Sequence, residues 1–106
     1  MSEEPDPRNC WAYFVRPSRS TFMEDATDEE SEVVGRHFNY LQGLLGEGRL
    51  IMAGPCIDGK GPGIIVFEAA DGDEARATME ADPAVVAGVF SAELHPFRAS
   101  LLRGRD

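Results

Sequence analysis

The chain has 106 residues, enough for one domain with a hydrophobic core of modest size. Its 19 acidic residues outnumber its 10 basic ones, and the net charge of −9 leaves no basic face to neutralise nucleic acid or an anionic membrane surface. Two cysteines do not make a disulfide framework. The acidic N-terminus is not followed by the apolar run of a signal peptide or membrane span, so we expect a cytoplasmic protein.

The first fifth of the chain predicts a tail, a strand and a loop. Residues 1–9 are charged and contain two prolines, which indicates a disordered tail. The apolar run 10–15 predicts a central strand, and Arg16-Pro17 is expected to end it because proline cannot donate to a ladder. A polar loop follows, with Phe22 and Met23 as its apolar anchor. We expect one domain over residues 10–99 and a loose C-terminal tail over 100–106.

A long amphipathic helix is predicted over residues 28–45. Thr27 and Glu30 have the spacing of a capping box at its start, and Gly46 and Gly48 close it. Its apolar residues recur at three- and four-residue spacing, with Tyr40 beside them: Val33, Val34, Phe38, Leu41, Leu44 and Leu45. His37 lies on the same stripe, so we expect it to point toward the sheet.

The second half of the chain predicts a hairpin, a helix and a last strand. Runs 50–57 and 63–70 read as paired strands, with a bulge or bend at Gly54-Pro55, and both cysteines are expected within strands. Asp71 begins a second helix as its N-cap, with Ala75, Ala77 and Met79 facing inward. Residues 84–87 suit one helical turn after Pro83, and residues 89–97 suit a fourth strand.

The resulting order βαββαβ predicts an α+β fold, a ferredoxin-like sandwich whose helices cover one face of a four-stranded antiparallel sheet. Nothing in the chain is left to cover the other face. Because an uncovered apolar sheet face usually finds a partner, we expect a homodimer formed through the sheet faces.

With these motifs placed, the sequence resembles the YCII-related proteins over about residues 13–97. The resemblance rests on the order and spacing of several short motifs rather than on any one of them. They are Arg16-Pro17 with Arg19 and Phe22, His37-x-x-Tyr40-Leu41, Gly48-x-Leu50, Ala53-Gly54-Pro55 with Asp58-Gly59, Glu68-Ala69, Asp82-Pro83, Gly88-Val89 and His95-Pro96-Phe97. The resemblance implies a ferredoxin-like protomer, a dimeric α-β barrel and an active site with a histidine and an aspartate, but no common reaction.

The resemblance makes His37 the candidate catalytic histidine and leaves two aspartates to partner it. Asp82 matches the Asp-Pro pair, although an N-cap role would explain it equally. Asp58 is the second choice, and a simple turn role would explain it. We expect Arg16, Tyr40 and Asp58 to bind substrate, with Arg16 suited to hold a carboxylate, although a solvated surface role would also explain Arg16.

The sequence has no metal-ligand spacing and no phosphate-binding glycine loop, so we expect no cofactor. Two functions remain. In the first, a His37–Asp82 pair carries out general acid–base chemistry, elimination or isomerisation, on a small organic molecule. In the second, the same cavity belongs to a non-catalytic metabolite-binding or interaction module. The two differ in whether His37 and Asp82 line one solvent-reachable pocket.

Overall fold

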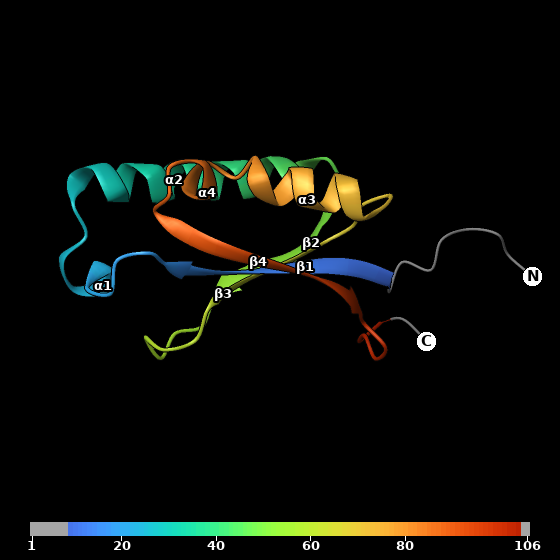
Figure 1. Cartoon of the computed structure of the whole chain (residues 1–106). Helices are drawn as coiled ribbons and strands as arrows, with labels where there is room; N and C mark the ends of the chain where they lie inside the picture. Colours follow the sequence, from blue (N-terminus) through green and yellow to red (C-terminus); the bar gives the residue numbers. More distant parts are fainter. Residues whose placement is uncertain (1–8, 105–106) are drawn as a thin grey trace, which may run out of the picture.

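A computed structural model describes residues 9–104, and Figure 1 shows the arrangement of their elements. The predicted N-terminal tail lies outside the described residues except for Asn9, which begins the first strand. The elements are β1 (Asn9–Pro17), α1 (Phe22–Asp25), α2 (Asp28–Gly46), β2 (Leu50–Pro55), β3 (Gly63–Phe67), α3 (Gly72–Glu80), α4 (Pro83–Val86) and β4 (Phe90–Arg98).

The strands form one antiparallel sheet in the order β2-β3-β1-β4. Helices α2, α3 and α4 lie together on one face of it, while the β2–β3 loop and the C-terminal segment extend on the other side (Figure 1). The predicted α+β, ferredoxin-like arrangement of one protomer is therefore confirmed. The small helix α1, which was predicted as loop, stands at one end of the sheet beside the start of α2.

Helix α2 begins with the capping box that the sequence predicts. The Thr27 hydroxyl accepts from the Glu30 amide at 3.0 Å, and the Glu30 carboxylate accepts from the Thr27 amide at 2.8 Å. The predicted inner face is only partly right, because Phe38 and Leu45 are 59% and 58% exposed. Each helical residue advances by about 100°, so Phe38 and Leu45 lie at the edge of the apolar stripe, about 40–60° beyond Leu41 on the side away from Val33 and Leu44.

Helices α3 and α4 are capped as predicted by aspartates that precede them. The Asp71 carboxylate accepts from the Glu74 amide at 2.8 Å, and Pro83 occupies the first turn of α4. The expectation that Ala77 faces inward is wrong, since Ala77 is exposed and Thr78 is buried in its place. The Thr78 hydroxyl donates to the Glu74 carbonyl oxygen and accepts from the Arg49 guanidinium, so its burial leaves no unpaired group.

Two strand predictions are also corrected. Strand β1 ends at Arg16-Pro17 as predicted, but it includes these two residues beyond the predicted run 10–15, since Pro17 pairs with Phe90 in the ladder to β4. The pairing of β1 with β3 stops at Val15, so within residues 9–104 no strand pairs with Pro17 on the side opposite to β4. Strand β2 ends at Pro55 and has its irregularity between Leu50 and Met52 rather than at the Gly54-Pro55 bend.

The loop after β2 corrects the prediction that both cysteines lie in strands. Cys10 is buried in β1, but Cys56 is exposed and outside β2. The Cys56 amide donates to the Pro62 carbonyl oxygen at 3.2 Å and closes the loop. The glycines that follow favour a turn over a longer strand.

Alternation along the strands gives the sheet two apolar faces. The face under the helices carries the main core, formed by Tyr13, Val15, Leu41, Leu44, Ile65, Phe67, Ala75 and Met79. The opposite face carries a smaller cluster of Cys10, Ala12 and Val66, against which Phe14, Ile51 and Ile64 pack. We call this opposite side the uncovered face.

Candidate functional site

His37 lies on the side of α2 that faces the sheet. Nine residues after the start of the helix, it follows Val33 by four positions and precedes Leu41 by four, and both of these are buried. The His37 side chain is itself 13% exposed, so solvent reaches only a small part of its ring. An imidazole in this position needs a hydrogen-bond partner, because a buried unpaired polar group costs about 1–3 kcal/mol.

Asp82 provides that partner from the junction between α3 and α4. Its side chain is completely buried, and it caps α4, since Oδ1 accepts from the Ala84 amide at 3.0 Å. The His37 Nδ1 atom lies 2.8 Å from Asp82 Oδ1 and 2.7 Å from Oδ2. The structure therefore places the histidine of α2 against the aspartate of the Asp-Pro pair, across 45 positions of sequence.

A third residue from the centre of the sheet completes the polar cluster. The Tyr13 hydroxyl donates to Asp82 Oδ2 at 2.8 Å, and Tyr13 has no exposed surface. Burial, together with the neighbouring Asp82 charge, raises the pKa of Tyr13 well above its usual range, so its hydroxyl stays protonated and remains a donor. We refer to Tyr13, His37 and Asp82 as the buried triad.

The triad determines which nitrogen of His37 carries the proton. Asp82 accepts from the Tyr13 hydroxyl and the Ala84 amide, as an ionised carboxylate does. We therefore assign the proton of the neutral imidazole to Nδ1, which donates to Asp82. The lone pair is then on Nε2, the ring nitrogen that Asp82 does not hold, and the ring is oriented for proton transfer at that atom.

Sequence reasoning did not identify Tyr13 as a member of the site. It lies within an apolar run that reads as ordinary core, and its ring also packs edge-on against Phe67 with centroids 5.7 Å apart. The available signal was that a tyrosine buried in a central strand needs a partner for its hydroxyl. The sequence alone does not show that α2 and the start of α4 pack over this strand, so it could not pair Tyr13 with Asp82.

An aromatic ring also contacts His37 from β4. The ring of Phe90 lies edge-to-face with the imidazole, with centroids 5.4 Å apart and an interplanar angle of 88°. Phe90 is only half-buried. The imidazole is thus fixed by Asp82 through a hydrogen bond and by Phe90 through ring packing.

The three predicted substrate-binding residues lie apart from the buried triad or have other partners. Arg16 is exposed on the side of β1 opposite to Tyr13, and its guanidinium donates to the Lys60 carbonyl oxygen at 2.9 Å. The Tyr40 hydroxyl, one helical turn after His37, donates to the Thr78 carbonyl oxygen at 2.7 Å.

Asp58 lies in the β2–β3 loop, where it accepts from the amides of Lys60 and Gly61, both at 2.9 Å. These bonds lower the pKa of the Asp58 carboxyl. They are the contacts of a turn-stabilising aspartate, and the structure does not bring Asp58 into contact with His37.

Within residues 9–104, no three histidine, cysteine or acidic side chains gather closely enough to hold a metal ion. Over the same range, none of the helices combines the length and the hydropathy that crossing a bilayer requires.

Comparison with known families matches the YCII-related domain to residues 18–98. The chain belongs to the YCII-related family. This match covers α1, α2 and both partners of the His37–Asp82 contact, while Tyr13 precedes it. Curated protein sequences give no match.

Among solved structures, one similar fold is 5-chloro-2-hydroxyhydroquinone dehydrochlorinase from Burkholderia phenoliruptrix AC1100, solved in complex with 2,5-dihydroxybenzoquinone. The TM-score is 0.64 at 18% identity, and the match covers 84% of this chain and 93% of the other. At this identity the likeness establishes a common fold, in agreement with the family assignment.

Proposed function

We propose that this YCII-related protein is a small enzyme in which His37 acts as a general base on a small organic molecule. The observation that supports it is the contact of a completely buried carboxylate with Nδ1 of a histidine that is 13% exposed. Asp82 directs the Nε2 lone pair away from itself and stabilises the imidazolium that forms when Nε2 accepts a proton. Neither role needs a metal or an organic cofactor.

The chemistry that suits this pair is proton abstraction from carbon next to an electron-withdrawing group. Nε2 takes the proton while the electron pair of the broken C–H bond moves into the substrate. In an elimination, the electron pair expels a leaving group from the neighbouring carbon and a double bond forms. In an isomerisation, the protonated His37 returns the proton at a different carbon.

The dehydrochlorinase with the similar fold supports elimination as the reaction class, because dehydrochlorination removes a proton and chloride from one molecule. It also supports a small hydroxylated or quinonoid ring as the first kind of substrate to test. The two chains share 18% identity, so the proposal takes the class of chemistry from this likeness and leaves the substrate to experiment.

The alternative, a non-catalytic binding module, draws on a different observation. Asp82 caps α4 through Ala84 and accepts from Tyr13, so the same contacts also tie α2, α4 and β1 together. A purely structural triad would make these bonds without turnover. Activity measurements separate the two functions, since a structural triad predicts binding of a metabolite with no exchange of its protons.

We further propose a homodimer through the uncovered face. Cys10, Ala12 and Val66 on this face are already buried within one protomer, and the apolar residues exposed beside them are Met52 and Phe97, at 57% and 46%. A second copy presents the same apolar surface, and a two-fold pair of sheets would bury both. The dimer would leave the helical side, and with it His37, outside the sheet-to-sheet contact.

The proposal is tested by incubating the protein in D₂O with a panel of small molecules that carry an acidic C–H bond. The panel includes hydroxylated and chlorinated hydroquinones, and mass spectrometry detects deuterium uptake or loss of chloride. General-base catalysis predicts uptake that depends on enzyme concentration for at least one chemical class. Binding of a panel member, seen by NMR line broadening, without any exchange or elimination would contradict it.

A further inference from the structure

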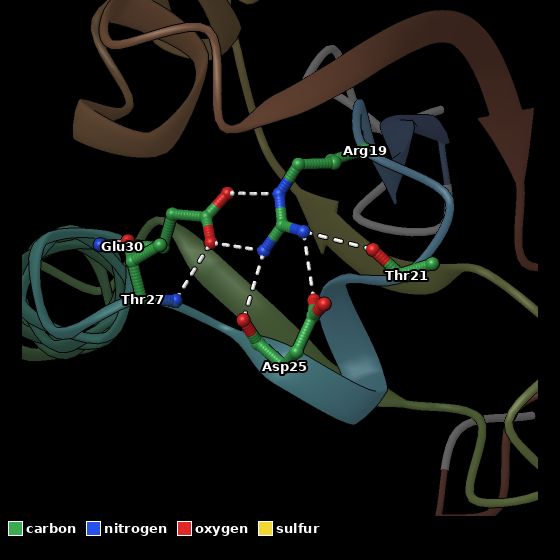
Figure 2. A network of polar contacts seen from close by, with 5 residues as sticks. All are labelled: Arg19, Thr21, Asp25, Thr27 and Glu30. Carbon is green, nitrogen blue, oxygen red and sulfur yellow. Dashed lines mark hydrogen bonds and ion pairs between the residues drawn. The ribbon is translucent and has the colours of Figure 1, made fainter.

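The Arg19 side chain contacts both ends of the segment that joins β1 to α2. Its guanidinium donates to both Glu30 carboxylate oxygens, at 3.1 Å and 2.6 Å, and to the Thr21 hydroxyl at 2.8 Å. It also donates to Asp25 Oδ1 at 2.7 Å and to the Asp25 carbonyl oxygen at 3.1 Å. Figure 2 shows these contacts, together with the bond from the Thr27 amide that ends on the same carboxylate. We call this network the Arg19 clasp.

The clasp uses every donor that the guanidinium has. An arginine side chain offers five N–H groups, and Nε, Nη1 and Nη2 of Arg19 make five hydrogen bonds between them. No donor remains for a carboxylate or phosphate of a ligand. The two carboxylates also offset the charge of Arg19, so the side chain is suited to hold the segment rather than to bind an anion.

The clasp fixes elements that lead to His37 along two routes. Glu30 is on the first turn of α2, seven residues before His37, and this spacing puts both on the same side of the helix. On the other route, Phe22 of α1 packs edge-on against Phe90 with centroids 5.8 Å apart. Phe90 in turn contacts the His37 imidazole.

We propose that Arg19 is a positioning residue for the candidate site. By holding α1 between the end of β1 and the start of α2, it keeps Phe22 against Phe90. The two rings then form an apolar wall that shields one side of the His37 imidazole from water. The assignment of His37 as the reactive group rests on the proposed function, but the wall itself can be tested without turnover.

The test measures the rate at which diethylpyrocarbonate modifies each histidine, read by peptide mass spectrometry. The reagent transfers its ethoxycarbonyl group to an unprotonated imidazole nitrogen and releases carbon dioxide and ethanol. His95 serves as the reference inside the same chain, because it lies on the uncovered face of β4 and contacts Glu93 rather than the clasp, so that any shielding by a second copy is the same in every variant. The variants are Arg19→Gln, which removes the clasp, and Phe22→Ala, which removes one of the two rings of the wall and leaves Phe90 in place.

Arg36→Gln is the matched control, since Arg36 also pairs with a glutamate on α2, Glu32, at 3.4 Å. In both test variants we expect the His37 rate to rise by up to about fourfold, the ratio of the 53% exposure of His95 to the 13% exposure of His37. The His95 rate should stay constant in all of them, and Arg36→Gln should match the wild type.

Three results would overturn the proposal. An unchanged His37 rate in Arg19→Gln would mean that the clasp does not position the wall. An unchanged rate in Phe22→Ala would mean that Phe22 does not shield the imidazole. A parallel rise at His95 would show that the whole chain loosens rather than this segment. None of these depends on finding a substrate, so failure of the proposed enzyme activity remains a separate result.

Discussion

Replacing Tyr13 with Phe removes a single hydroxyl from the buried triad and keeps the ring. Because Tyr13 and Asp82 are both completely buried, water cannot easily replace the lost donor to the carboxylate. A hydrogen bond to a charged group contributes about 1.5–3 kcal/mol, so the free energy of unfolding should fall by about that amount. The ring contact with Phe67 is unaffected, which confines the change to the hydrogen bond.

Tyr40→Phe provides the matched control. It removes the same hydroxyl from a half-buried tyrosine whose acceptor is a neutral carbonyl oxygen, that of Thr78. A bond of this kind contributes about 0.5–1.5 kcal/mol. Urea unfolding of both variants at neutral pH, with the slope of the transition unchanged, gives the two losses. A Tyr13→Phe loss no larger than that of Tyr40→Phe would refute the role of Tyr13 as a donor to a buried charge.

The pH dependence of this difference has a defined sign. The folded state raises the pKa of Tyr13, so the folded protein keeps the hydroxyl proton above pH 10, where the unfolded chain begins to lose it. The contribution of Tyr13 is therefore fully present below about pH 10 and declines above it. The stability difference between wild type and Tyr13→Phe should narrow by about 1.4 kcal/mol per pH unit above that point.

Three further predictions concern acid, thiols and assembly. Hydrogen bonds from Arg19 and from the Thr27 amide lower the Glu30 pKa from 4.5 to about 2. The stability advantage of wild type over Arg19→Gln should therefore be present above pH 4.5 and vanish as the pH falls toward 2. A difference in free energy of unfolding that stays constant over this pH range would contradict this. Burial raises the pKa of the Cys10 thiol, whereas Cys56 is exposed. A disulfide reagent should therefore react rapidly with one thiol per chain, and Cys56→Ser should abolish this rapid reaction. A rapid reaction that persists in Cys56→Ser would contradict the prediction. Light scattering should give a dimer that Phe97→Asp on the uncovered face dissociates and Phe38→Asp on the outer side of α2 does not; a wild-type monomer would refute the interface.

The fold was predictable because local rules and apolar periodicity agree along most of the chain. Thr27 with Glu30, Asp71 and Asp82 each make the cap that their spacing indicates, and these caps set the starts of three helices. The errors arose where apolar character alone was used. Phe38, Leu45 and Ala77 are apolar but lie off the buried faces of their helices, because the rotation of the helix decides burial.

The sequence predicts the His37–Asp82 pair of the candidate site but not the residues that surround the pair. The family pattern favours Asp82 over Asp58 as the neighbour of His37, and the structure places Asp82 in contact with the ring. Tyr13 and Phe90 join them from strands far away in sequence, and only the order and register of the sheet bring these strands beneath α2. The Arg19 clasp likewise depends on a short helix, α1, that was predicted as a loop.

The most direct test of the central claim compares wild type with His37→Gln in the deuterium-exchange assay, on whichever panel compound the wild type turns over. Glutamine retains a polar group beside Asp82 but cannot accept and return the proton as imidazole does. General-base catalysis by His37 predicts a loss of about 10²–10⁴-fold in rate, with a melting temperature close to that of the wild type. A variant that keeps the wild-type rate while its melting temperature falls would show that His37 is structural and is not the general base.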